Sequence, residues 1–259
     1  MLLLISPAKR LAERSVPAAS EMRWEPPMFE ERSRALAQIM KKFSAAQLSE
    51  LMDVSSDIAQ LNRDRFRNFP ASFSNGSTLP AIAQFQGDVY QAMNVESYTK
   101  AQMEFLQNHV LILSGLYGLL RPLDKMHPYR LEMGTSLKGP GFNSLYHYWG
   151  KTITSTIQDR IHRRGEKALL NLASKEYSRA VKFKDLDIPV IGVDFLELRS
   201  GKWKTVSYNA KRARGLMLDW IVRNRINDIE KARSFRDGYA FDEEKNEPGQ
   251  TRWIFKKID

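Results

Sequence analysis

One segment of the chain combines glycines and arginines in a way that suits an anion. An apolar run at residues 110–113 is followed at once by small residues, and two arginines come soon after. The residues here that can do chemistry are Ser114, Gly115, Gly118, Arg121 and Arg130. Glycine allows a tight backbone path in which main-chain N–H groups face an anion, and a guanidinium binds carboxylate or phosphate through paired hydrogen bonds. We therefore predict a phosphate or carboxylate site, the alternative being a structural turn ahead of a proline-rich loop.

The glycine spacing differs from that of the common nucleotide-binding loops. The segment lacks the Gly-Lys-Ser/Thr ending of a P-loop, and it does not match a dinucleotide-binding fingerprint. It loosely resembles the hairpin of a helix–hairpin–helix element, in which glycine amides contact DNA phosphates. Those glycines usually have one residue between them, whereas Gly115 and Gly118 have two.

Two further stretches are rich in basic residues and nearly free of acids. Residues 199–225 contain eight Lys and Arg against one acid, and residues 160–184 contain eight against two. The side chains expected to bind phosphates in these stretches are Lys175, Lys182, Lys184, Lys211, Arg212 and Arg214. Tyr208 adds a surface on which a base can stack. A solvated set of surface charges is the alternative.

Carboxylates near these segments offer groups for acid–base chemistry. Asp88 and Tyr90 follow a turn at residues 85–87, and Glu132 follows Arg130. Such a carboxylate can transfer a proton or orient an arginine. The alternative interpretations are that Asp88 caps a turn and that Arg130 and Glu132 form a structural ion pair. The histidines lack metal-site spacing and the chain has no cysteine, so we expect no metal and no cofactor.

The composition of the chain indicates which classes of partner it can bind. Of its 259 residues 42% are hydrophobic, which suffices for a large core, and 40 Lys and Arg stand against 30 Asp and Glu. A basic surface favours nucleic acids, nucleotides, acidic metabolites or acidic membranes. No apolar stretch approaches the roughly 20 residues that span a bilayer. We therefore expect a soluble, cytoplasmic protein without a membrane partner.

Hydrophobic periodicity predicts both helices and strands. Strands are expected at 2–5, 110–113, 168–170, 189–198 and 204–208, with a hairpin near the C-terminus. Helices are expected at 29–40, 45–52, 56–69, 100–108, 144–164 and 210–225. The pattern predicts a mixed α/β (α+β) fold, with one compact domain over residues 1–259, a mixed sheet, helices around it and a basic cleft.

Three of the expected strands pass into small polar residues with a basic residue close behind. After strands 2–5, 110–113 and 168–170 come, in turn, Ser6 and Lys9, then Ser114, then Asn171 and Ser174. If these strands are parallel neighbours, the loops meet at one carboxyl edge, where α/β sheets usually bind ligands. The side chains expected in such a pocket, besides Ser114, Arg121 and Arg130, are Lys9, Asp88, Tyr90, Glu132, Asn171, Ser174 and Lys211.

Seven separated blocks, in the right order, resemble the YaaA family of peroxide-stress proteins over essentially the whole chain. The blocks are residues 4–9, 85–90, 113–124, 128–134, 171–177, 210–215 and 238–241. The resemblance implies a cytoplasmic protein of compact α/β fold that supports survival of hydrogen peroxide and lowers free iron. It also implies a basic cleft, a helix–hairpin–helix-like element and binding of double-stranded DNA. The chain departs from the family pattern at Arg10 and at residues 247–249.

Two functions follow from these residues. The first is a DNA-binding protein of the peroxide stress response that protects DNA and limits free iron, binding the phosphates of duplex or structured DNA through the cleft. The alternative is an enzyme that acts on a phosphorylated or nucleotide-like small molecule in the pocket at the strand ends. An iron chelator is a weaker third interpretation, because the sequence has no recognisable ligand set. No residue receives a catalytic role from the sequence.

Overall fold

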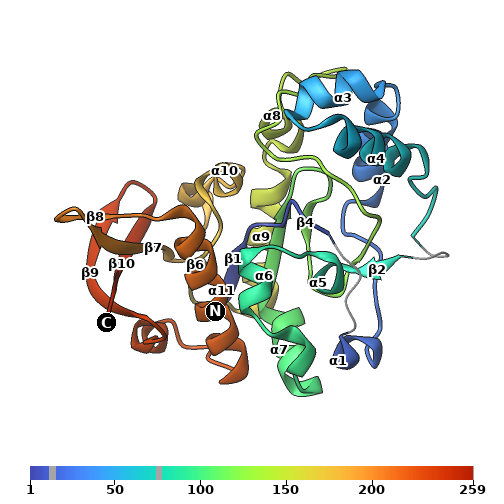
Figure 1. The fold of residues 1–259 in the computed structure, drawn as a ribbon. Coiled ribbons are helices and arrows are strands. Elements are labelled where there is room, and N and C mark those ends of the chain that lie inside the picture. The colour runs from blue at the N-terminus through green and yellow to red at the C-terminus, as the bar shows by residue number, and fades with distance from the viewer. Residues whose placement is uncertain (12–15, 74–77, 259) are drawn as a thin grey trace.

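An eight-stranded mixed sheet lies at the centre of the molecule (Figure 1), whose computed structural model describes residues 1–11, 16–73 and 78–258. The strand order is β4-β3-β1-β6-β7-β10-β9, with β8 paired to β7. These strands are β1 (Leu2–Ile5), β3 (Val110–Ser114), β4 (Gly118–Leu120), β6 (Leu169–Asn171), β7 (Val190–Arg199), β8 (Lys202–Lys204), β9 (Tyr239–Glu247) and β10 (Gln250–Lys257). A second, two-stranded sheet pairs β2 (Leu79–Pro80) with β5 (Lys125–Met126). The expected mixed α/β fold is confirmed.

Three central strands, β1, β3 and β6, are parallel and fully buried. β1 pairs in parallel with β3 on one side and β6 on the other, and β6 pairs in parallel with β7. Every residue of β1 and β3 is buried. A strand covered on both faces has no solvent side, so it reads as a continuous hydrophobic run rather than an alternating one. The three strands expected to share one carboxyl edge therefore do share it.

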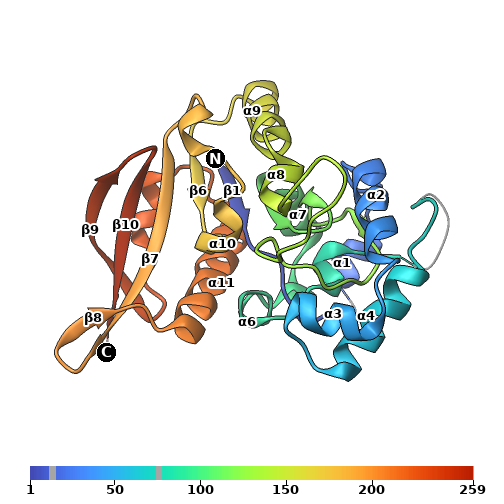
Figure 2. The same cartoon turned by 90° about the horizontal axis from the view of Figure 1, so that it is seen from above.

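Helices cover both faces of the sheet, with α9 on one face and α11 on the other (Figure 2). The α-helices are α1 (Pro17–Ser20), α2 (Glu30–Met40), α3 (Ala45–Met52), α4 (Ser56–Arg67), α5 (Ala81–Gln84), α6 (Asp88–Ala92), α7 (Lys100–His109), α8 (Leu145–Trp149), α9 (Thr152–Arg164), α10 (Lys175–Ser178) and α11 (Ser207–Arg223). Three 3₁₀ turns are η1 (Val95–Ser97), η2 (Phe183–Asp185) and η3 (Glu230–Ser234). None of the described helices combines the length and hydropathy needed to cross a bilayer.

Local sequence signals explain where several helices begin. Ser44 accepts a hydrogen bond from the Gln47 amide while the Gln47 side chain accepts one from the Ser44 amide, a capping box that starts α3. Thr99 and Gln102 form the same arrangement at the start of α7. Helices α2, α3 and α4 lie together at one side of the sheet (Figure 1). The helices expected in these regions are confirmed.

Two expected elements are wrong in detail. The helix expected at 144–164 is two helices, because the chain breaks at Gly150, whose φ is +49°. The strand expected at 204–208 ends at Lys204, and Ser207 already begins α11. Tyr208 therefore lies on a helix rather than a strand.

A turn between two strands stands where a helix–hairpin–helix-like element was expected. Ser114 ends β3, Gly118 begins β4, and these two residues pair in an antiparallel register. Only the preceding α7 is helical, because the residues after the turn continue as β4 and not as a second helix. The segment therefore forms a β-hairpin, and the helix–hairpin–helix expectation does not hold for it.

Candidate functional site

Hydrogen bonds tie together the loops that follow β1 and β6. The Ser174 amide donates to Ser6 Oγ at 2.8 Å, and Ser6 Oγ in turn donates to Ser174 Oγ at 3.3 Å. The buried Tyr90 hydroxyl, on α6, donates to the Ser6 carbonyl at 2.8 Å. The prediction that the strand-end loops meet is confirmed for Ser6 and Ser174, and Tyr90 joins them from α6.

A buried pair of hydroxyls stands at the end of β3. Ser114 Oγ, at the end of β3, lies 2.6 Å from the Tyr129 hydroxyl and accepts a hydrogen bond from the Tyr117 amide at 2.9 Å. Ser114 is fully buried and Tyr129 is 4% exposed. Burial raises the pKa of Tyr129 well above its ordinary value, so the phenol keeps its proton and acts as a hydrogen-bonding group.

Two cationic side chains near Tyr129 share one carboxylate. Lys9 Nζ lies 3.3 Å and Arg130 Nε lies 3.1 Å from the same oxygen, Glu132 Oε1. Together with Tyr177 they line a cavity of about 10 Å³, enough for about one water molecule. Two positive charges against one negative charge leave this cluster with a surplus cation. We call Ser6, Lys9, Ser114, Tyr129, Arg130 and Glu132 the strand-end site.

Asn171 and Asp88 lie at the margins of this site. Asn171 is 3% exposed, and its Oδ1 accepts a hydrogen bond from the Ala173 amide at 3.0 Å, which shapes the loop after β6. Asp88, the first residue of α6, lies 4.0 Å from Lys211 Nζ on α11. Asn171 therefore has a structural role, and Asp88 faces the basic helix α11.

The two glycines of the β3–β4 turn serve packing. A Cβ on Gly115 would lie 2.3 Å from the Leu131 carbonyl oxygen. Gly118 has a φ of +68°, and a Cβ there would lie 2.7 Å from the Trp149 ring. Both residues are buried. These positions require glycine because the Leu131 backbone approaches Gly115 and the Trp149 ring approaches Gly118.

Two arginines expected to bind phosphate are held within the protein, Arg121 by an ion pair and Arg214 by burial. Arg121 Nε and its backbone amide each donate to the Asp124 carboxylate at 2.8 Å. Desolvation raises the pKa of this buried carboxyl to about 6, against the opposing pull of Arg121. Arg214 lies near Asp194 and Arg252, and its burial lowers its pKa. The structure therefore does not bring Arg121 or Arg214 to an open phosphate surface.

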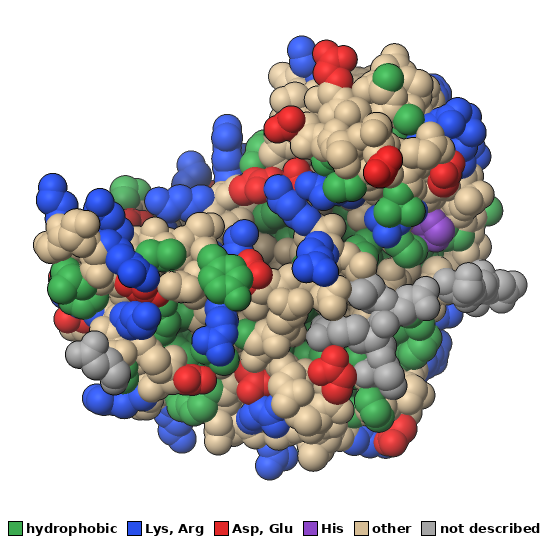
Figure 3. Space-filling model, viewed as in Figure 1, with side chains coloured by type: hydrophobic (Ala, Val, Ile, Leu, Met, Phe, Trp, Pro, Cys, Tyr) green, Lys and Arg blue, Asp and Glu red, His purple; other side chains and the backbone are tan. Residues whose placement is uncertain are grey.

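The remaining basic residues of the prediction are exposed to solvent. They are Lys175, Lys182, Lys184, Lys211 and Arg212. Figure 3 shows one face of the molecule, where Lys and Arg side chains gather over the half that holds β8 and around the hollow beside it. These cations are free to meet a polyanion without first leaving a buried partner.

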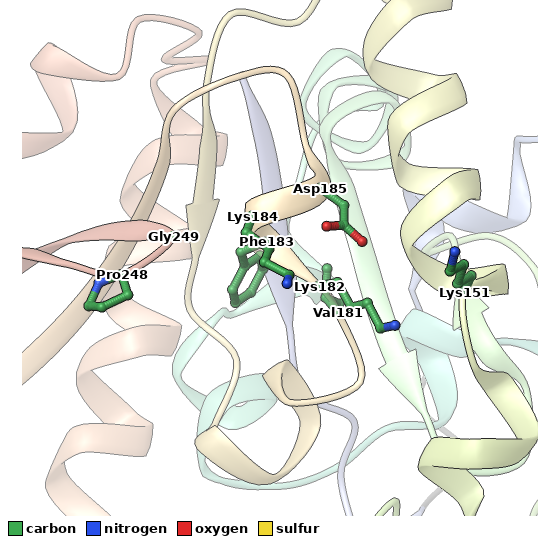
Figure 4. Close-up of a pocket in the computed structure, with 8 residues that line it drawn as sticks. All are labelled: Lys151, Val181, Lys182, Phe183, Lys184, Asp185, Pro248 and Gly249. Carbon is green, nitrogen blue, oxygen red and sulfur yellow. The ribbon is translucent and has the colours of Figure 1, made fainter.

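Two of them line an open hollow with a lysine that the sequence reasoning missed. The hollow, of about 620 Å³, lies between the start of α9, residues 181–185 and the β9–β10 turn. Lys151, Lys182 and Lys184 line it, and Figure 4 shows Lys151 and Lys182 reaching in from opposite elements. We call it the lysine hollow. Lys151 carried no signal in the sequence, because it stands outside both basic stretches and only the fold brings it near Lys182.

A comparison with known families places the chain in one of them. A family model described as peroxide stress protein YaaA matches residues 1–245. The chain belongs to the YaaA family. Within this YaaA-family chain, four of the blocks that carry the resemblance, residues 4–9, 113–124, 128–134 and 171–177, contribute to the strand-end site or its rim. The family is one of peroxide stress proteins, which agrees with the expected link to the oxidative stress response.

Proposed function

We propose that this YaaA-family protein binds DNA in the peroxide stress response, through contacts of its exposed lysines with backbone phosphates. The lysine hollow carries this proposal. Its lining holds three lysines and one acid, Asp185. The Lys182 amide donates to Thr154 Oγ1 at 3.0 Å, so the segment that bears Lys182 and Lys184 is fixed to α9. A fixed, open and positively charged concavity suits a phosphate chain better than a single small ion.

The chemistry of lysine indicates which kind of binding to expect. An ammonium group on a flexible stem acts as a hydrated point charge, whereas bidentate recognition of a base edge favours arginine. Contacts of this kind position a protein on DNA without reading its sequence. We therefore expect binding to duplex or structured DNA with little base preference, and protection of the DNA by occupancy of its backbone.

The limitation of free iron stays a prediction of the family resemblance. Among residues 1–11, 16–73 and 78–258, no three His, Asp or Glu side chains gather as a metal site would require. We assign no residue to that effect.

Fluorescence anisotropy with a labelled duplex across a salt series tests the proposal. Each phosphate that a lysine neutralises contributes about −0.9 to the slope of log Kobs against log salt. A slope of several units, with no displacement by mononucleotides or sugar phosphates, is the expected result. Absence of binding at low salt, or displacement by one small phosphorylated compound, contradicts it.

A second candidate function has its own observation in the strand-end site. Lys9 and Arg130 share the single Glu132 carboxylate, and Tyr129, next to Arg130, is hydrogen-bonded to Ser114. Glu132 balances only one of the two positive charges, so a bound phosphate group supplies the second negative charge. This arrangement favours a small phosphorylated or nucleotide-like ligand and agrees with an enzyme site. A thermal-shift panel of nucleotides and sugar phosphates tests it. Stabilisation that Arg130→Ala abolishes supports this function, and no shift from the whole panel counts against it.

A further inference from the structure

A pocket of about 210 Å³ lies between α6 and α11 and shares no lining residue with the lysine hollow. The two helices lie side by side (Figure 1). Three side chains from each helix line the pocket: Asp88, Gln91, Ala92, Tyr208, Arg212 and Leu216. Pockets that hold drug-sized ligands measure about 300–1,000 Å³, so this one suits a smaller molecule.

Close packing of the two helices fixes the walls of this pocket. A Cβ on Gly215 would overlap the Val89 carbonyl oxygen, so the backbone of α11 lies directly against α6. Tyr208, Arg212 and Leu216 follow one another at intervals of four residues and therefore share one face of α11. Two packed helices, rather than a loop, thus determine where the lining side chains stand.

The lining carries one acid and one base, which come from opposite helices. Within the described part of the chain, the Arg212 guanidinium has neither an ion pair nor a hydrogen bond, with Asp88 or with any other residue. Asp88 Oδ2 lies 4.0 Å from Lys211 Nζ, and the Lys211 side chain is 52% exposed, so this contact is weak. Both charged groups of the lining are therefore able to bind a ligand.

The other lining groups suit a short apolar chain. Ala92 and Leu216 contribute hydrocarbon surface, and Tyr208, which is 61% exposed, contributes an aromatic ring. The Gln91 amide adds one hydrogen-bond acceptor and one donor group. Apolar walls with a few polar groups are typical of a site that holds a small molecule and orients it by its polar ends.

We propose that this pocket binds a free α-amino acid with an apolar side chain. The α-ammonium group donates hydrogen bonds to the Asp88 carboxylate, and the α-carboxylate accepts them from the Arg212 guanidinium. The apolar side chain of the ligand packs on Leu216. This proposal is independent of the DNA binding proposed above and gives the protein a second kind of ligand.

Charge distinguishes an amino acid from simpler ligands of this pocket. A phosphate or another anion suits Arg212 but is repelled by Asp88, whereas an amine suits Asp88 but leaves Arg212 without a counter-charge. A zwitterion brings each of these groups the opposite charge at once. Lys211 stands beside Asp88 but does not line the pocket, so the lining itself has no net charge.

Titration calorimetry on the unmodified protein tests the proposal with L-leucine and two analogues that each lack one charge. The analogue 3-methylbutylamine has no carboxylate, and 4-methylpentanoate has no ammonium group. L-leucine is expected to bind saturably and each analogue at least about tenfold more weakly, because each loses a charge-assisted hydrogen bond. Absence of L-leucine binding overturns the proposal, as does equal binding of 4-methylpentanoate or displacement of L-leucine by inorganic phosphate.

Two variants and a matched control locate the binding. Arg212→Ala and Asp88→Asn are each expected to weaken L-leucine binding at least about tenfold. Lys204→Ala, which removes an exposed cation from β8, is expected to bind L-leucine like wild type. Circular dichroism checks that the variants are folded, and the analogue series decides on the unmodified protein alone. If Arg212→Ala binds L-leucine as wild type does, the ligand binds elsewhere and the proposal fails.

Discussion

The hydroxyl groups of Ser114 and Tyr129 lie 2.6 Å apart, and Tyr129 directly precedes Arg130, which shares the Glu132 carboxylate with Lys9. Ser114 ends a central strand, and Tyr129 belongs to the segment that carries both Arg130 and Glu132. Their hydrogen bond therefore couples the sheet to the charged part of the strand-end site. Because both groups are buried, their polar atoms depend on each other rather than on water.

Removing either hydroxyl is expected to destabilise the fold unequally. Ser114→Ala leaves the Tyr129 hydroxyl and the Tyr117 amide without a partner, at about 2–3 kcal/mol, whereas Tyr129→Phe removes one hydrogen bond, at about 1 kcal/mol. The double variant is expected to cost less than the sum of the two. Denaturant unfolding measures all three. Additive losses in the double variant contradict a direct hydrogen bond.

The β3–β4 turn is expected to reject a side chain at Gly118. Gly118→Ala places a Cβ against Trp149 and strains a φ of +68°, so we expect a loss of about 2–4 kcal/mol. Gly141→Ala is the matched control, because its φ is +80° but no atom lies within 4 Å of its Cβ position. It incurs the backbone strain alone, about 1 kcal/mol. Equal melting temperatures for the two variants would show that Trp149 moves aside without cost.

The strand-end site was largely predictable, because its residues follow strands that the sequence marks clearly. Continuous apolar runs identify buried strands, and small polar residues mark where they end, so Ser6, Ser114 and Ser174 are recognisable from the amino-acid pattern alone. The sequence does not determine that the three strands are parallel neighbours, since strand order depends on long-range pairing. The role of Tyr129 was not predictable, because its contact with Ser114 joins residues 15 positions apart in the chain.

The positions of charged residues predicted the candidate site less well than the pattern of apolar residues did. Arg121 and Arg214 resemble phosphate ligands in sequence, but Arg121 is paired with Asp124 three residues along the chain, and Arg214 is buried near Asp194. Conversely, Lys151 joins the lysine hollow only through tertiary contacts. The sequence interpretation considered only the backbone freedom of the glycines. In the structure, Gly118 must be glycine because the ring of Trp149, far along the chain, leaves no room for a side chain.

Asp124 is expected to make stability depend on pH in an unusual direction. Burial raises the pKa of its carboxyl from 3.8 to about 6 in the folded protein. Between these values the folded state holds a proton that the unfolded state releases, so the stability from this group is full below pH 3.8 and is lost as the pH rises to about 6.

Asp124→Asn removes this dependence. The stability of the wild type minus that of the variant is expected to fall by about 2 kcal/mol from pH 4 to pH 6 and to stay level above pH 7. Urea unfolding of both proteins across this range measures the difference. A difference that rises with pH over the same interval would mean that Arg121 outweighs desolvation and holds the carboxyl ionised.

The most direct test of DNA binding through the lysine hollow is the salt dependence of duplex binding in a variant whose hollow has lost positive charge. The double variant Lys182→Ala, Lys184→Ala is compared with Lys41→Ala, Lys42→Ala, which removes two exposed lysines just after α2. We predict that the slope of log Kobs against log salt becomes shallower by roughly two units in the first variant, and that the second matches wild type. Equal slopes in the two variants would contradict DNA binding through the lysine hollow.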